Sequence, residues 1–159
     1  MKNICLIATG GTIVSKDSGN GLEPELTPQD LLACVPELQE IAKISVRELY
    51  RMDSTNISQE HWLGMADCIR REYHAFDGFV VIHGTDTMAY TAAALSYLVQ
   101  NSGKPIVLTG SQKSVYQRDT DARRNLIDAF CFAADTRSHG VYIVFDGMAI
   151  LGTHARKTR

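Results

Sequence analysis

Four short, uninterrupted apolar segments recur along this sequence, and they constrain the fold more than any other feature. They are Ile4–Ala8, Phe79–Ile82, Ile106–Leu108 and Val141–Phe145. Each is short enough for a strand and apolar at every position, so it predicts a strand buried on both faces. Helical patterns separate these segments, which is typical of a parallel sheet covered on both sides. We therefore expect an open, doubly wound α/β fold with a mainly parallel sheet, formed as one domain over residues 1–159.

The remaining elements follow from capping and periodicity. Thr27 before Pro28 is typical of a helix start, and Trp62, Met65 and Ile69 recur at helical spacing after Ser58. The loop predictions are Thr9–Glu25, rich in Gly, Ser, Asn and Asp, and a tight turn at Asp146–Gly147. We expect helices at 28–35, 58–71, 88–99 and 121–134, a half-buried strand at 44–49 and a further strand at 148–151.

Charge and hydrophobicity exclude several classes of protein. The chain has 16 basic and 18 acidic residues, a formal net charge of −2, so neither nucleic acid nor an anionic membrane is the expected partner. Hydrophobic residues make up 45% of the chain, which excludes overall disorder. The longest apolar run, Ala129–Ala134, is far shorter than the roughly 20 residues that a membrane helix needs.

The four cysteines indicate a reducing compartment. Cys5, Cys34, Cys68 and Cys131 are widely spaced, and the sequence contains no CxxC. A disulfide framework or a zinc site is therefore not expected, and we predict buried free thiols. The apolar stretch at the N-terminus is also too short for a signal peptide. Together these features predict a cytoplasmic protein without a bound metal.

Ligands of doubly wound folds bind beyond the carboxyl ends of the strands, so the loops after Ala8, Ile82 and Leu108 rank first as candidate sites. The first loop reads Thr9-Gly10-Gly11-Thr12. Paired glycines let the backbone approach a ligand and present N–H groups to an anion. Thr12 places a hydroxyl beside those donors, as a nucleophile beside an oxyanion hole requires. The alternative is a tight turn in which Thr12 only bonds the backbone.

The second loop reads His83-Gly84-Thr85-Asp86-Thr87 and places a hydroxyl beside a carboxylate. Its alternative role is to cap the next helix, with Thr85 or Asp86 as the N-cap. His83 is more typical of a histidine with satisfied structural hydrogen bonds than of a general base.

Two further polar segments could serve a site or simply be solvated. Met52–Asn56 contains four consecutive polar side chains and could bind a small polar substrate. The basic segment His154–Arg159 is, by itself, typical of a solvated tail.

Taken together, these motifs are much more specific than they are singly. ATGGTI near the N-terminus, then DST, DGFVVIHGTDTMAYTA and PIVLTGS, resemble the asparaginase family, in particular its bacterial and archaeal type I members. The resemblance extends over essentially the whole chain, from Ile4 onward. It implies hydrolysis of the side-chain amide of L-asparagine to L-aspartate and ammonia, with no metal or organic cofactor. It also implies a homo-oligomer.

The resemblance assigns roles to individual residues. Thr12 and Thr85 match the family's two threonine nucleophile candidates, and Lys157 and Asp86 match the lysine and aspartate paired with the second threonine. A threonine hydroxyl needs a base, and a lysine can act as one only where its surroundings lower its pKa. Asp86 also matches the acceptor for the substrate's α-ammonium group.

Further matches concern substrate contacts. Ser54 matches the serine that holds the α-carboxylate, and Thr55 stands where many relatives carry a glutamine that touches substrate. The backbone N–H groups of Gly11 and Thr85 are the expected oxyanion donors. Ser111 lies in the loop that resembles the family's backbone contact near the leaving amide.

The chain differs from the family pattern in two ways. Relatives commonly carry a tyrosine in the loop after TGGT, whereas this sequence has Leu22 there. Family members also continue into a smaller C-terminal domain, which is expected to be absent from these 159 residues. Two alternatives remain: a glutaminase or an amidase of the glutaminyl-tRNA amidotransferase type, and a non-catalytic amino-acid-binding module.

Overall fold

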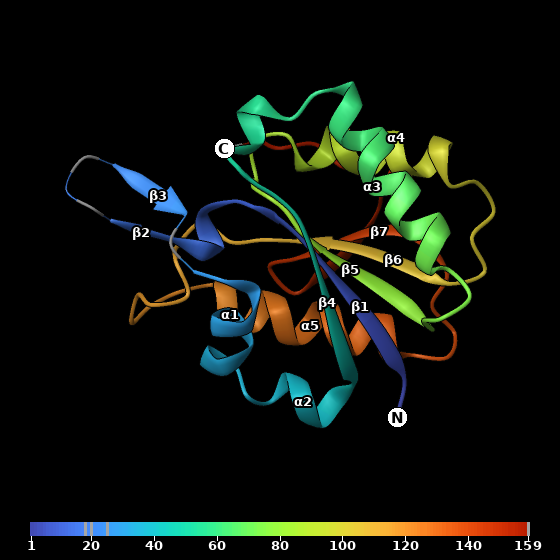
Figure 1. Ribbon diagram of the computed structural model, residues 1–159, viewed down its shortest axis with the longest axis horizontal. Coiled ribbons are helices and arrows are strands. Elements are labelled where there is room, and N and C mark those ends of the chain that lie inside the picture. Colours follow the sequence, from blue (N-terminus) through green and yellow to red (C-terminus); the bar gives the residue numbers. More distant parts are fainter. Residues whose placement is uncertain (18, 20, 25, 159) are drawn as a thin grey trace.

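The computed structural model describes residues 1–17, 19, 21–24 and 26–158, arranged as a sheet between two layers of helices (Figure 1). The strands are β1 (Asn3–Gly10), β2 (Ser15–Asp17), β3 (Leu22–Pro24), β4 (Lys43–Met52), β5 (Gly78–Ile82), β6 (Pro105–Thr109), β7 (Gly140–Phe145) and β8 (Met148–Leu151). The helices are α1 (Pro28–Cys34), α2 (Leu38–Ile41), α3 (Gln59–Glu72), α4 (Met88–Leu98) and α5 (Ala122–Ala134), with 3-10 turns η1 (Thr12–Val14) and η2 (Ser54–Asn56).

The main sheet of the described residues has six strands in the order β4-β1-β5-β6-β7-β8. All neighbours are parallel except β7 and β8, which pair antiparallel. This confirms the prediction of a mainly parallel, doubly wound sheet. The next strand after β1 in the main sheet, β4, lies on one side of β1, and the following strand, β5, lies on its other side. The switch point, where such folds bind ligands, therefore lies between β1 and β5.

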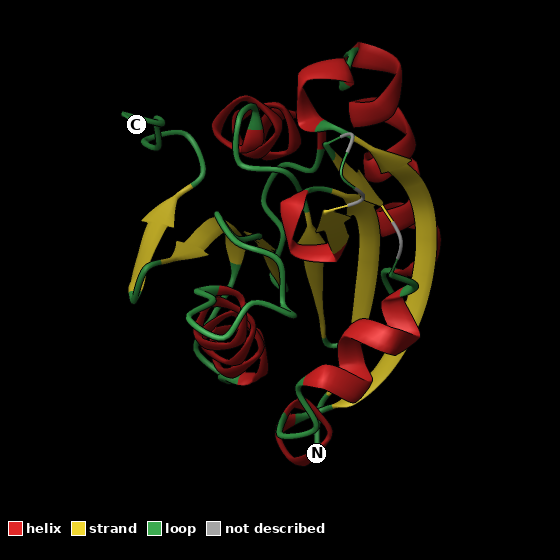
Figure 2. Cartoon of the chain, turned by 90° about the vertical axis from the view of Figure 1, so that its left-hand side faces the viewer, coloured by secondary structure: helices red, strands yellow, loops and turns green. Residues whose placement is uncertain are grey.

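Helices cover both faces of the sheet (Figure 2), and an apolar core fills the space on each side. On one face, Leu126 and Phe130 of α5 pack with Leu6 and Val80 of the sheet, together with α1 and α2. On the other face, α3 and α4 pack against the side chains that alternate with these along β1 and β5. Burial on both sides explains why the central strands are apolar at every position.

Helices α4 and α5 lie on opposite faces of the sheet, although both connect neighbouring strands in the same direction. Helix α4 links β5 to β6, and α5 links β6 to β7. The two crossovers therefore have opposite hands, an exception to the usual right-handed rule. As a result, the segment that joins β6 to α5 passes over the carboxyl edge of the sheet, beside the switch point.

The helix starts agree with the sequence for two helices and differ for a third. Thr27 caps α1 through a reciprocal capping box with Asp30, and Ser58 caps α3. Helix α4 instead begins after Thr87, whose side chain makes no capping hydrogen bond. The alternative role of Thr85 or Asp86 as its N-cap is therefore wrong, and both side chains are free for other contacts.

Two other predictions need correction. The segment expected to be a loop at 9–25 contains a small hairpin, in which β2 pairs antiparallel with β3. Gly19 and Gly21 have positive φ angles, a conformation that glycine tolerates and that a tight reversal needs. The four cysteines are free, as predicted, but Cys131 is exposed and Cys34 is only half-buried. Within the described residues, every helix is too short or too polar to cross a membrane.

Candidate active site

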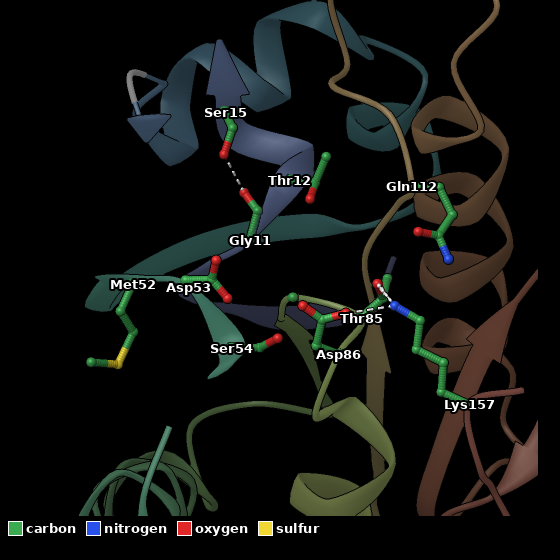
Figure 3. A pocket seen from close by; sticks show the side chains of 11 residues that line it. Gly11, Thr12, Ser15, Met52, Asp53, Ser54, Thr85, Asp86, Gln112 and Lys157 are labelled. Atoms are coloured by element: carbon green, nitrogen blue, oxygen red, sulfur yellow. Dashed lines mark hydrogen bonds and ion pairs between the residues drawn. The ribbon is translucent and has the colours of Figure 1, made fainter. Parts of the chain in front are cut away.

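A polar cleft of about 170 Å³ lies at the switch point, where several loops meet at the carboxyl edge of the sheet (Figure 3). Its lining comes from the loops after β1, β4, β5 and β6 and from the C-terminal segment. The lining residues are Gly11, Thr12, Ser15, Met52, Asp53, Ser54, Gly84, Thr85, Asp86, Gln112 and Lys157. The cleft thus contains six of the eight residues that the sequence singled out.

The floor of the cleft is built from backbone segments in close contact. Gly11 has a φ of +97°, and a Cβ atom there would lie 2.7 Å from the backbone nitrogen of Gly84. A Cβ atom on Gly84 would in turn lie 2.8 Å from the Oγ of Ser54. Real Cβ atoms do not approach other atoms so closely, so only glycine fits at either position. This packing holds the three loops in fixed register around the cleft.

Side-chain hydrogen bonds fix two of these loops further. The Thr87 hydroxyl donates to the Ser54 carbonyl oxygen at 2.7 Å, and the Thr87 N–H donates to the Ser54 hydroxyl at 3.4 Å. Ser54 is only 3% exposed. On the other side of the cleft, the Ser15 hydroxyl donates to the Gly11 carbonyl oxygen at 2.9 Å (Figure 3). Hydrogen bonds thus join the loops after β4 and β5, and a further one braces the loop after β1 internally.

Lys157 connects the C-terminal segment to the loop after β5. Its Nζ donates to Oδ1 of Asp86 at 2.6 Å and to the Thr85 hydroxyl at 3.1 Å (Figure 3). The Lys157 and Asp86 side chains keep 32% and 53% of their surface exposed, so the pair is accessible to a ligand. Some 70 residues of chain separate these groups, and the structure brings them together as the resemblance implied. Lys157 is therefore not part of a merely solvated tail.

The side chains of two expected site residues make hydrogen bonds within their own loops. The Thr55 N–H and hydroxyl both donate to Oδ1 of Asp53, at 2.9 and 3.0 Å. The Ser111 side chain is buried and donates to the carbonyl oxygen of Lys113. Neither residue lines the cleft. Their hydrogen bonds shape the loops that carry Ser54 and Gln112. The side chain of Leu22 lies outside the described part of the structure.

The cleft also includes residues to which the sequence assigned no individual role. Gln112 follows Ser111, and its N–H is held by the carboxylate of Asp121 at 2.9 Å. Asp53 places a second carboxylate beside Asp86. Gln112 has a local signal, because it lies in the loop after Leu108 that the strand-end rule ranked highly. Ser15 lies in the loop after Ala8, which the same rule ranked highly, but only the fold of η1 shows that its side chain enters the cleft.

The electrostatics of the cleft suit a small zwitterionic ligand. Two carboxylates, one ammonium group and several hydroxyls line it. The carboxylates can accept from a ligand's ammonium group, while hydroxyls and backbone N–H groups can donate to its carboxylate. Among the described residues, no group of three or more His, Cys, Asp and Glu side chains could hold a metal ion.

A doubly wound sheet with a polar cleft at its switch point defines an α/β domain that can bind a small polar ligand. The chain belongs to the asparaginase family, because residues 3–159 match the family model for "Asparaginase, N-terminal". It is 37% identical over 155 residues to an L-asparaginase of Thermococcus kodakarensis. This alignment covers 97% of this chain and 47% of that protein.

Two further comparisons extend this result. The chain is 42% identical over 150 residues to a glutamyl-tRNA(Gln) amidotransferase subunit of Methanococcus vannielii, which covers 92% of this chain and 35% of that protein. Its fold superposes on L-asparaginase I of Vibrio cholerae with a TM-score of 0.91 at 37% identity, over 99% of this chain and 48% of the other. The chain thus spans about half the length of the asparaginases that it matches.

Proposed function

We propose that the chain is the catalytic domain of an amidohydrolase that converts L-asparagine to L-aspartate and ammonia. The observation that carries the proposal is the contact of Lys157 Nζ with both the Thr85 hydroxyl and the Asp86 carboxylate. A hydroxyl next to a lysine–carboxylate pair provides a route for moving a proton during nucleophilic attack. The matches to L-asparaginases over nearly the whole chain support the choice of substrate.

The proposed reaction proceeds through an ester on a threonine. The Thr12 hydroxyl oxygen forms a bond to the amide carbon. Its proton passes to Thr85 Oγ1, while the Thr85 proton passes to Lys157 Nζ and one Lys157 proton passes to the Asp86 carboxylate, so Lys157 stays an ammonium group. The amide C–N bond then breaks, and the leaving nitrogen takes a proton and departs as ammonia. Water attacks the ester, which releases L-aspartate and returns the proton to Thr12. In each attack the backbone N–H groups of Gly11 and Thr85 stabilise the negative carbonyl oxygen.

Substrate selection in this proposal depends on recognising two opposite charges. Asp86 accepts from the α-ammonium group, while its other role is to position Lys157. The Ser54 hydroxyl, buried and held by Thr87, donates to the α-carboxylate. Thr55 acts on the substrate only indirectly, through the loop that it braces, and the loop of Ser111 contributes a backbone contact near the leaving amide. The mainly polar lining of the cleft supports this arrangement.

A glutamine-type amide is the second candidate substrate. The similarity to the glutamyl-tRNA(Gln) amidotransferase of Methanococcus vannielii, at 42% identity, favours it specifically. One measurement distinguishes the two candidate substrates: the rate of ammonia release from L-asparagine is compared with that from L-glutamine at equal concentrations. Faster release from asparagine supports the proposal. Faster release from glutamine supports the alternative, and L-aspartate binding without any release indicates a binding module.

Two variants test the roles of the threonines. Thr12→Ala removes the proposed nucleophile, so ammonia release should stop while L-aspartate still binds in calorimetry. Thr85→Val keeps the shape of the side chain and removes the hydroxyl that Lys157 contacts. Turnover within tenfold of the wild type, a change of only about 1.4 kcal/mol in the barrier, would exclude a catalytic role for the hydroxyl that was removed.

The setting of the domain is also a proposal. We propose that it works with a second, smaller domain, as suggested by the half-length match to asparaginases. Helix α4 has no charged residue and exposes Tyr90 and Tyr97, which suits an interface between copies in a homo-oligomer. The four free thiols support a cytoplasmic location.

A further inference from the structure

A series of hydrogen bonds, buried from Thr91 onward, reaches the back of the cleft from the helices on one face of the sheet. The indole Nε1–H of Trp62 in α3 donates to the Thr91 hydroxyl of α4 at 2.9 Å. The Thr91 Oγ1 lies 2.8 Å from Nε2 of His83, and Nδ1 of His83 lies 2.6 Å from the carbonyl oxygen of Gly84. His83 is 1% exposed and Thr91 is fully buried. The prediction that His83 has satisfied structural hydrogen bonds is thus confirmed.

The two end groups of this hydrogen-bond series determine which atom donates and which accepts at every step. An indole N–H can only donate and a carbonyl oxygen can only accept. His83 must therefore donate from Nδ1 to Gly84. In the neutral ring Nε2 is then an acceptor, and the Thr91 hydroxyl donates to it. Burial lowers the pKa of His83 and favours the neutral ring. Thr91 thereby selects the tautomer that can hold Gly84.

The last hydrogen bond orients a peptide that faces the cleft. The described chain contains no cis peptide bond, and in a trans peptide the C=O and the N–H point to opposite sides. Because the Gly84 carbonyl points to the buried ring of His83, the N–H of Thr85 points away from it. Gly84 and Thr85 both line the cleft. Among the described residues, no protein acceptor takes the Thr85 N–H, so it is available to a ligand.

We propose that His83 is a positioning residue, held in its Nδ1–H tautomer by Thr91 and Trp62, that aims the Thr85 N–H at the reacting carbonyl oxygen. This inference rests on the proposed amidohydrolase function. The N–H of Thr85 can stabilise an oxyanion only if it already points to where that oxygen forms. We call the hydrogen bonds from Trp62 through Thr91 and His83 to Gly84 the relay. Breaking one of these hydrogen bonds should reduce the rate of the chemical step more than it weakens substrate binding.

The test uses the 159-residue chain with three threonine variants. Thr91→Val breaks the relay at nearly constant volume, and Thr91→Ser keeps the hydroxyl. Thr109→Val is the matched control: Thr109 is fully buried at the end of β6, and its hydroxyl has no hydrogen-bond partner among the described residues. We expect Thr91→Val to lower kcat about tenfold with KM changed less than twofold. Thr91→Ser and Thr109→Val should stay within about twofold of the wild type.

Two nuclear magnetic resonance measurements do not depend on turnover. The ¹⁵N shifts of His83 should show a protonated Nδ1 and an unprotonated Nε2 in the wild type. Relaxation of the Thr85 amide should show greater mobility in Thr91→Val but not in Thr109→Val. Absence of ammonia release, both from this chain and from the chain joined to the smaller domain proposed above, would count against the proposed function, and these two measurements would still decide the positioning role. A protonated Nε2 in the wild type, an unchanged Thr85 amide in Thr91→Val, or equal effects of Thr91→Val and Thr109→Val would each overturn the inference.

Discussion

Replacing Lys157 by methionine separates catalysis from stability most clearly in this chain. Lys157→Met keeps most of the side-chain length and removes the ammonium that lies 2.6 Å from Asp86 Oδ1 and 3.1 Å from Thr85 Oγ1. With 32% and 53% of the two side chains exposed, water screens the pair strongly. An exposed ion pair of this kind contributes less than about 1 kcal/mol to stability.

The expected effect on turnover is much larger. A positioned proton donor or acceptor contributes about 10²–10⁴-fold to a rate, so we expect kcat to fall by about 10³-fold, or about 4 kcal/mol of barrier. The melting temperature should move by less than about 4 °C, which is what 1 kcal/mol corresponds to in a chain of this size. Ammonia release from L-asparagine and a thermal melt of the same samples measure both quantities.

Arg156→Met provides the matched control, because Arg156 is the exposed neighbouring cation and has no role in the proposed mechanism. It should retain turnover within about twofold. Two results would refute the reasoning. In one, Lys157→Met retains more than a tenth of the wild-type kcat. In the other, Arg156→Met loses as much activity as Lys157→Met, so that local charge alone accounts for the effect.

Three further predictions concern other parts of the site. Asp86→Asn should raise KM for L-asparagine and lower kcat together, because the carboxylate both accepts the α-ammonium group and holds Lys157; an unchanged KM in steady-state kinetics would contradict this. Gly11→Ala should destabilise the fold by more than about 1 kcal/mol, since its φ is +97° and its Cβ would meet the Gly84 nitrogen at 2.7 Å; a denaturant midpoint equal to that of the wild type would disprove it. Burial lowers the folded-state pKa of His83, so protonation favours the unfolded chain, and this contribution to stability is present above about pH 6.5 and is lost as the pH falls. His83→Gln should therefore lose less unfolding free energy than the wild type between pH 7 and pH 5, and equal losses in denaturant titrations would argue against it.

The sequence by itself determined the local elements of this protein, because their signals are local. Alternation of apolar strands with helical periodicity predicted β1, β5, β6 and β7 and the class of fold. Thr27 indicated a helix start, and its capping box joins residues only three positions apart. The glycines and hydroxyls after two strands marked the cleft before any contact was known, since the carboxyl ends of parallel strands meet at one edge.

Only the tertiary structure decided which of those polar residues face one another. Ser111 and its neighbour Gln112 are equally polar in sequence, yet one is buried against Lys113 and the other lines the cleft. The order of the strands and the face that each helix covers decide two sets of contacts. One is the contact of Lys157 with Thr85, and the other is the series of hydrogen bonds from Trp62 to Gly84. Those choices are set by packing between segments far apart in the chain, and a local pattern of residues contains no information on how distant segments pack.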